Sequence, residues 1–353
     1  MANDQQGALH LVVPSHRPGE SPSSLCRAAA QGALLRLKPG VYVERRSWER
    51  APLWTKHRAF AAAVALSIPS AILCRETALA IYGVPLLRVR REVELRTLSA
   101  SMVGTAAAST LSSVRSPGFR LRRIGPPVPR GVTARSAHQA YRAGESAVRP
   151  MLVEAPGVVL SDGIQPLVTV EPLPFALLDT LPRASFEFAA VALDAVLAGR
   201  YGYRKVVRPM HLEAVEEWLW SRDAQAAWRS MVDFADPRSE SPGESRSRAL
   251  IHQLGFAAPE LQREVVLPSG RQVRLDFDWV ADGVAGEFDG RVKYQGAAAG
   301  TVADGTSVYW DEKWREEEIE EHTGKRFVRW QWADLDNPRR LERRLMIKGV
   351  SKR

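Results

Sequence analysis

Four charged residues at alternating positions stand out in the segment GEFDGRVKY, residues 286–294. They are Glu287, Asp289, Arg291 and Lys293. Side chains alternate between the two faces of a strand, so these four would share one face while Phe288 points to the other. Core packing requires no such row. A site that binds a cation through carboxylates and a phosphate through neighbouring basic groups would require such a row.

A second acidic strand precedes this one in the segment RQVRLDFDWV, where Asp276 and Asp278 alternate with apolar residues. The two segments are joined by Asp-Gly at 282–283, which is typical of a two-residue type I′ hairpin turn. That turn predicts Asp278 opposite Glu287 and Asp276 opposite Asp289. Up to four carboxylates would then converge on one face.

Such a cluster needs a counter-charge, because like charges directly opposite each other destabilise a sheet. Mg²⁺ or Mn²⁺, which prefer oxygen ligands, fit best, and Arg291 and Lys293 could supply part of the counter-charge. Lys293 would lie near the phosphate, and the chemistry would be phosphodiester hydrolysis. The alternative interpretation is an exposed, solvated acidic face on an ordinary hairpin.

A helix must position the remaining acid, Glu244. The segment SPGE at 241–244 predicts a helix start with Ser at the N-cap, Pro at N1 and Glu at N3, which is a capping box. This capping box alone would explain the Glu without catalysis. Arg246 and Arg248 follow on the next turns and would contact phosphate or be solvated. The expected order of the later elements is a helix at 242–254, strands at 262–267, 271–280 and 284–290, a loop at 295–307, an acidic helix and a last strand from 325.

These motifs, PGESRSR, ELQREV, RLDFDW, GEFDGRVKY and GKRFVRWQWADL in this order over residues 238–345, resemble the PD-(D/E)xK nuclease-like domain. The branch is similar to the very-short-patch repair endonucleases. The resemblance implies that Glu244 is the helix acid and Asp276 the first metal ligand. It implies that Glu287 and Asp289 are the pair on the second strand, so that Asp276, Glu287 and Asp289 are the expected metal ligands.

The sequence departs from that family in one respect. The residue two positions after Glu287 is Asp289 where the family usually has Lys, and the residue two positions after Asp289 is Arg291. Lys293 would replace the missing Lys, or the site would follow the repair-enzyme variant with an acid at that place. The missing Lys counts against catalytic activity, and the retained carboxylates count for it.

The first third of the chain is strongly basic. Residues 1–135 contain 20 Lys and Arg against 7 Asp and Glu, whereas the rest contains 29 against 33. A basic front end on a near-neutral body is typical of nucleic-acid binding, although an Arg-rich composition alone would also produce it. The segment SPSSLCRAAAQG predicts a short helix, and ALLRLKPGVYV predicts a hairpin, as at the end of a winged-helix domain. The candidate phosphate contacts on this helix and hairpin are Arg27, Arg36, Lys38, Arg45 and Arg46.

The segments LLRLKPGVYV, CRETALAIYGVPLL and VTVEPLPFALLDTL resemble the AbiEi-type antitoxins of type IV toxin–antitoxin systems over about residues 23–200. The resemblance implies a winged helix that binds promoter DNA and a cognate toxin protein as a partner. The chain lacks an obvious first helix of the winged domain before residue 21.

The expected fold class is a multidomain α/β protein. It would have a loose tail at 1–20, a winged-helix-like DNA-binding region at 21–98 and a middle α/β then helical region at 99–235. A restriction-endonuclease-like domain with a mixed central sheet would follow at 236–353.

Several classes of protein are excluded. Two cysteines make no disulfide framework, and no signal peptide or membrane-spanning segment is apparent, so a cytoplasmic protein without membrane contact is expected. No Walker loop or dinucleotide-binding fingerprint is present, which argues against a nucleotide cofactor.

Together these patterns predict a DNA-binding protein of bacterial defence or toxin–antitoxin type with a Mg²⁺-dependent endonuclease domain. The alternative is a non-enzymatic antitoxin or transcriptional regulator whose nuclease fold only binds DNA or a partner toxin. A nuclease directed at RNA also stays open.

Overall fold

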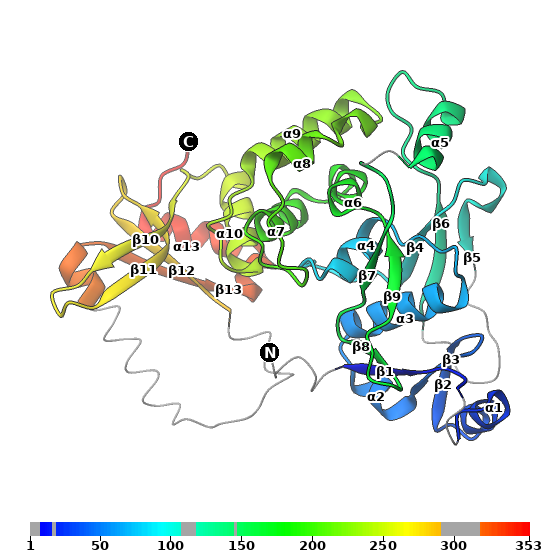
Figure 1. Ribbon diagram of the computed structural model, residues 1–353. Coiled ribbons are helices and arrows are strands. Elements are labelled where there is room, and N and C mark those ends of the chain that lie inside the picture. The colour runs from blue at the N-terminus through cyan, green and yellow to red at the C-terminus, as the bar shows by residue number, and fades with distance from the viewer. Residues whose placement is uncertain (1–7, 16–18, 107–117, 145–146, 291–317) are drawn as a thin grey trace. The chain divides into compact units, whose positions relative to one another are not determined.

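The computed structural model describes residues 8–15, 19–106, 118–144, 147–290 and 318–353 (Figure 1). The chain divides into two compact units. The first unit comprises residues 1–184 and 199–233, and the second comprises residues 185–198 and 234–353. The protein is mixed α/β, as expected from the sequence. None of the helices in the described ranges is long and apolar enough to cross a lipid bilayer.

The first unit begins with the helix and hairpin that the sequence predicts. Helix α1 (Pro22–Ala30) starts at Ser21, whose side chain caps the Ser24 N–H at 3.2 Å. Strands β2 (Leu34–Lys38) and β3 (Val41–Glu44) then pair antiparallel. Their turn places Gly40 at φ 75°, a left-handed conformation that glycine adopts without strain.

The prediction that residues 1–20 form a loose tail is wrong for residues 9–12, which form strand β1 (Leu9–Val12). This strand lies between β3 and β8 (Val158–Leu160) in a sheet of order β2-β3-β1-β8. Leu9 and Leu11 are buried, because they pack into the core under this sheet. Strand β8 pairs parallel with β1, and β9 (Leu167–Val170) pairs antiparallel with β7 (Met151–Glu154).

The remaining elements of the first unit surround a second sheet of order β4-β6-β5. Strands β4 (Glu92–Arg96) and β6 (Arg120–Ile124) are parallel, and β5 (Gly104–Ala106) pairs antiparallel with β6. The helices are α2 (Arg45–Arg50), α3 (Leu53–Ser67), α4 (Arg75–Tyr82), α5 (Ala134–Ala143), α6 (Leu173–Thr180), α8 (Pro209–Glu213) and α9 (Arg222–Phe234).

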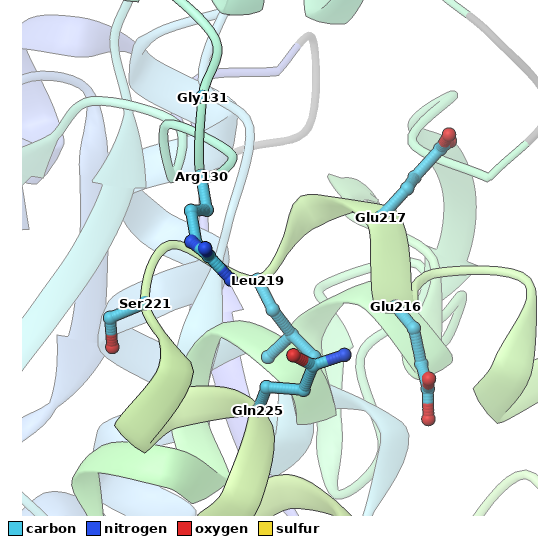
Figure 2. Close-up of a pocket in the computed structure, with 7 residues that line it drawn as sticks. All are labelled: Arg130, Gly131, Glu216, Glu217, Leu219, Ser221 and Gln225. Carbon is cyan, nitrogen blue, oxygen red and sulfur yellow. The ribbon is translucent and has the colours of Figure 1, made fainter.

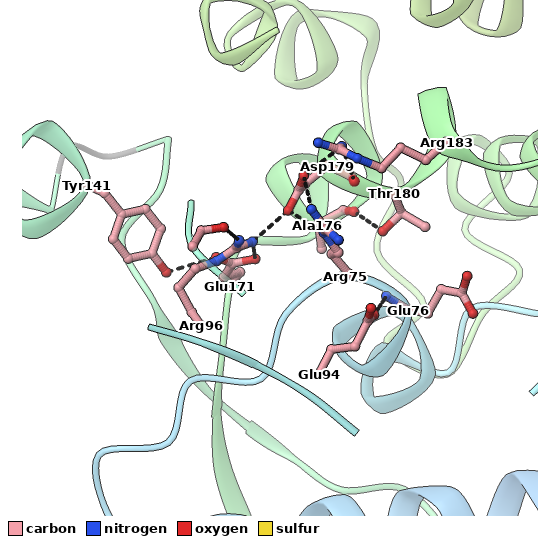
Figure 3. A network of polar contacts seen from close by, with 11 residues as sticks. Arg75, Glu76, Glu94, Arg96, Tyr141, Glu171, Ala176, Asp179, Thr180 and Arg183 are labelled. Carbon is pink, nitrogen blue, oxygen red and sulfur yellow. Dashed lines mark hydrogen bonds and ion pairs between the residues drawn. The ribbon is translucent and has the colours of Figure 1, made fainter. Parts of the chain in front are cut away.

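A buried network of charges joins several of these elements (Figure 3). Arg96 of β4 donates to both oxygens of Glu171, at 2.6 and 2.9 Å, and to Asp179 of α6 at 2.8 Å. Tyr141 of α5 donates to Glu171 at 2.8 Å, and Arg75 of α4 donates to Asp179 at 2.8 Å. The side chains of Arg96, Glu171 and Asp179 are at most 1% exposed. Because each acid has basic partners, the network acts as a structural tie between elements distant in the sequence.

The second unit has a four-stranded mixed sheet of order β10-β11-β12-β13. Strands β10 (Glu260–Val266), β11 (Gln272–Trp279) and β12 (Val284–Asp289) pair antiparallel in sequence, and β13 (Arg326–Gln331) is parallel to β12. The helix, the three strands and the last strand of this unit follow one another as expected, whereas the expected loop at 295–307 and most of the acidic helix after it lie outside the described residues. The helices are α7 (Phe186–Leu197), α10 (Pro242–Gln253), a helix at 318–323, α12 (Trp332–Leu335) and α13 (Pro338–Lys348).

The core of the second unit is formed by aromatic and aliphatic side chains of the sheet and of α10 and α13. Phe277, Trp279 and Trp330 are at most 3% exposed and pack together with Leu250 of α10. Trp330 also donates its indole N–H to Ser247 Oγ at 2.7 Å, which locks α10 onto the sheet.

Candidate functional site

The N-terminus of α10 positions Glu244, and of the predicted capping box the half made by the Ser241 side chain is present. The Glu244 N–H donates to Ser241 Oγ at 3.2 Å, and Ser241 Oγ donates to Glu244 Oε1 at 2.7 Å. The backbone N–H of Glu240 donates to Glu244 Oε2 at 2.8 Å. Glu244 is only 8% exposed, so its carboxylate is held in one orientation from within its own helix turn.

The residue before it, Gly243, allows α10 to approach the sheet closely. A Cβ built on Gly243 would lie 1.8 Å from Cε1 of the Phe288 ring. No side chain larger than hydrogen fits without moving that ring or the helix. Gly243 therefore sets the distance between Glu244 and the end of β12.

Substitution of Gly243 by alanine is expected to lower the free energy of unfolding by about 1–3 kcal/mol, because it overpacks this contact. Chemical denaturation would measure the loss. The matched control is Phe288→Ala, alone and combined with Gly243→Ala. If the clash with the ring is the cause, the double variant loses less than the sum of the two single losses; simple additivity would show the cause lies elsewhere.

The register of the β11–β12 hairpin differs from the predicted one. Trp279 pairs with Val284 and Phe277 with Gly286, so a four-residue turn over 280–283 replaces the expected two-residue turn. Asp276 therefore lies opposite Glu287 and not opposite Asp289. Gly286 explains part of the choice, since a Cβ there would lie 2.7 Å from the Trp330 ring.

Asp278 does not join the predicted cluster. It pairs with Ala285 across the hairpin, and its side chain is fully buried. Arg263 donates to Asp278 Oδ2 at 2.9 Å, and Lys325 forms an ion pair with the other oxygen. The expectation that four carboxylates converge is corrected for this residue, whose charge is neutralised inside the fold.

Asp276, in contrast, lies among other acids. Burial raises the pKa of Asp276 to about 7, and the negative charges of Glu244 and then Glu287 add to this rise. Hydrogen bonds from the Phe288 N–H, at 3.0 Å, and from the Gln262 side chain lower the pKa and offset part of the effect. The carboxylates of Glu244 on α10 and Glu287 on β12 are thus both close enough to repel that of Asp276 on β11.

The second-strand acids have neighbours on β13. Glu287 lies in register with Arg329, which donates to Glu287 Oε2 at 2.9 Å. Asp289 is the last residue of β12 and shares the face of Glu287 by strand alternation. The predicted residues Arg291 and Lys293 lie outside the described part of the chain.

The donor set of this cluster suits a hard divalent cation, since carboxylate oxygens are the ligands that Mg²⁺ and Mn²⁺ prefer. A cation would relieve the repulsion that raises the pKa of Asp276. Within the described residues, no group of three or more His, Cys, Asp or Glu side chains is already arranged to hold a metal ion. The carboxylates therefore lie near one another but are not yet placed as metal ligands. A cation would have to draw them closer, and it would compete with Arg329 for Glu287.

Two predicted phosphate contacts, Arg246 and Arg248, are corrected. Arg246 donates to Glu187 at 2.8 Å, to Asp336 at 2.7 Å and to a backbone carbonyl. Arg248 donates to both oxygens of Asp194, at 2.8 and 2.9 Å, and its side chain is 9% exposed. Both arginines bind α10 to its surroundings, since their guanidinium groups are occupied by buried or half-buried acids.

The predicted basic residues of the first unit are distributed over α1, β2 and α2. Arg27, Arg36 and Arg46 are exposed. Arg45 donates to the Gly32 carbonyl at 2.7 Å and so has a structural role as well. Burial and then the positive charge of Arg123 on β6 lower the pKa of Lys38. A group of basic side chains with a desolvated lysine near an arginine would attract an anion such as phosphate.

Two residues near the acidic cluster were not predicted. Gln262 on β10 donates to Glu244 Oε2 at 2.8 Å, and Arg329 binds Glu287. The only sequence signal for them is strand alternation, which requires the register of β10 and β13 to be known. A cavity of about 340 Å³ in the first unit, lined by residues that include Arg130, Glu216 and Gln225, contains none of the predicted site residues (Figure 2).

Comparison with known proteins adds little to this picture. No family model matches the chain. A stretch of 101 residues is 34% identical to the uncharacterised protein Rv2248 of Mycobacterium tuberculosis strain H37Rv, and the uncharacterised protein MT2308 of strain CDC 1551 matches to the same extent. The match covers 29% of this chain and 35% of each relative. The chain thus spans about a third of the length of these relatives.

Proposed function

We propose that the second unit is a metal-dependent nuclease that hydrolyses phosphodiester bonds in DNA. The observation that carries this proposal is the convergence of Glu244, Asp276 and Glu287 from three separate elements, with a strongly raised pKa of Asp276. Acids that repel one another at the end of a sheet destabilise the fold. The binding of a cation would explain why the chain carries them there.

Each acid has its own role in the proposal. Asp276 and Glu287 hold the cation, with Asp289 beside them at the end of β12. When bound, Mg²⁺ or Mn²⁺ supplies an activated water and neutralises charge on the phosphate. Glu244, held by hydrogen bonds from the Ser241 hydroxyl and the Glu240 N–H, adds a carboxylate beside Asp276. Lys293 remains the proposed phosphate contact of this segment.

The first unit is proposed to bind DNA. Its exposed Arg27, Arg36 and Arg46, together with Lys38, would contact phosphates and would carry no sequence specificity by themselves. Because this unit resembles the AbiEi-type antitoxins, a cognate toxin protein is proposed as its partner.

A second candidate is a DNA-binding regulator that does not cleave. It is favoured by the ion pair of Arg329 with Glu287, which neutralises an acid that a nuclease would give to a metal. It is favoured also by Asp289, which stands where the PD-(D/E)xK family usually has Lys.

Incubation of supercoiled plasmid with the full chain and Mg²⁺ or Mn²⁺ tests the two candidates. Wild type is expected to nick or linearise the plasmid, and Asp276→Ala and Asp289→Ala are expected to lose this activity. Glu264→Gln, an exposed acid of β10 on the same sheet, is the matched control and should cleave normally.

The absence of cleavage by wild type would contradict the nuclease proposal. If the same protein still retards the plasmid in a gel, and more salt abolishes the retardation, the regulator is supported. If neither cleavage nor retardation occurs, both proposals are wrong.

A further inference from the structure

Gln262 has an unusual backbone conformation for a strand residue. Its φ is 56°, one of three positive values among the non-glycine residues that the structure describes. Its neighbours keep a regular antiparallel register, Leu261 with Phe277 and Arg263 with Leu275. Gln262 therefore lies opposite Asp276, but its own backbone is left-handed. This conformation is unfavourable for most residues; glycine adopts it freely and asparagine adopts it at a smaller cost.

The side chain of Gln262 connects two elements of the acidic cluster. Its Nε2 donates to Glu244 Oε2 at 2.8 Å, across from β10 to α10. The same side chain forms a hydrogen bond with the carboxylate of Asp276 on β11. A side-chain amide nitrogen has two hydrogens, so one group can serve both acids.

We propose that Gln262 is a positioning residue that holds the carboxylates of Glu244 and Asp276 at their places in the cluster. This inference rests on the proposed function, because the reason to hold two repelling acids in place is the binding of a cation. A neutral double donor suits that task, because it fixes both acids without supplying a positive charge that would compete with the metal.

The strained backbone supports a functional role over a structural one. If only fold stability mattered, a glycine at this position would avoid the left-handed penalty, and an extended backbone would add a ladder hydrogen bond. Backbone strain in an otherwise regular element is found mainly where a side chain must be aimed at a site. In this protein the Gln262 side chain points toward two acids on different elements, Glu244 and Asp276.

Gln262→Gly tests the inference in the full-length protein. Glycine accepts the backbone conformation and removes the amide, so the melting temperature is expected to stay within a few degrees of wild type. Mn²⁺ affinity, measured by calorimetry, is expected to fall about 10-fold or more, as for residues that orient metal ligands. Gln262→Asn keeps an amide on a shorter side chain that does not reach Glu244, and it should behave as the glycine variant does. Gln272→Gly, at the exposed start of β11, is the matched control and should bind Mn²⁺ as wild type does.

A readout without metal separates this inference from the proposed function. Carboxyl-carbon NMR should find the pKa of Asp276 higher in Gln262→Gly than in wild type, because a hydrogen bond to the ionised form is lost. If wild type binds no Mn²⁺, the nuclease proposal fails, and this NMR comparison alone decides the role of Gln262. Equal Mn²⁺ affinities, or equal pKa values of Asp276 in the metal-free proteins, would overturn the inference.

Discussion

Replacement of Arg96 by leucine is expected to lower the free energy of unfolding of the first unit by about 3–5 kcal/mol. The substitution leaves Glu171 and Asp179 buried without the guanidinium that binds both of them. Leucine fills part of the space but returns no hydrogen bond to either acid. Urea denaturation would measure the loss, and hydrogen exchange would locate it in β4 and α6, with β11 of the second unit as the internal reference.

Arg183→Leu is the matched control, because Arg183 binds the same acid from the rim of the network. It contacts Asp179 at 2.8 Å, but its side chain is 37% exposed and lies over the Trp220 ring. Water replaces a partner at such a site, so a loss of about 1 kcal/mol or less is expected. Equal losses in the two variants would show that burial of the ion pair is not what makes Arg96 important.

The buried network also illustrates what the sequence could not predict. Arg96 ends a strand that reads as an ordinary alternating segment, and its partners Glu171 and Asp179 lie 75 and 83 positions away. Local pattern carries no information on such distant pairs. The same limit explains Arg246 and Arg248, which look like solvated helix charges until their partners on α7 and α12 are known.

Local signals were sufficient where short-range chemistry determines structure. The Ser-Pro-Gly-Glu start of α10 was predicted because the N-cap hydrogen bond and the proline at the first helical position involve only residues 241–244. The order of strands in the second unit was predicted because their alternation is strong. In contrast, β1 was missed, since LHLV is only four residues long and its partners lie more than 25 residues away.

For the acidic cluster, the prediction identified the residues better than their arrangement. Asp276 and Glu287 follow from residue type and strand alternation, whereas Glu244 follows from the resemblance to the nuclease-like domain. Their arrangement depends on a register that the close approach of Gly286 to Trp330 decides, and no turn rule contains that contact. Gln262 could not be predicted, because its position depends on a backbone conformation unusual for its residue type.

The pH dependence of metal binding is expected to be steep below neutrality. Because the pKa of Asp276 is about 7, a cation must displace a proton from it in acid. Mn²⁺ affinity should therefore fall about tenfold for each pH unit below 7, and should level off above it. Calorimetry between pH 5 and pH 8 measures this profile. A flat profile would show that Asp276 is not a ligand.

The same raised pKa makes an opposite prediction for stability without metal. Folded Asp276 keeps its proton up to about pH 7, whereas in the unfolded chain this carboxyl has its ordinary pKa of 3.8 and releases the proton near that pH. The folded state therefore loses stability from this group as pH rises from about 4 to 7. Asp276→Asn removes the ionisation, so at pH 7 without metal this variant is expected to melt higher than wild type. Saturating Mn²⁺ should reverse the order, since it stabilises only the protein that binds it. A variant less stable than wild type in both conditions would mean that Asp276 serves the fold and not a cation.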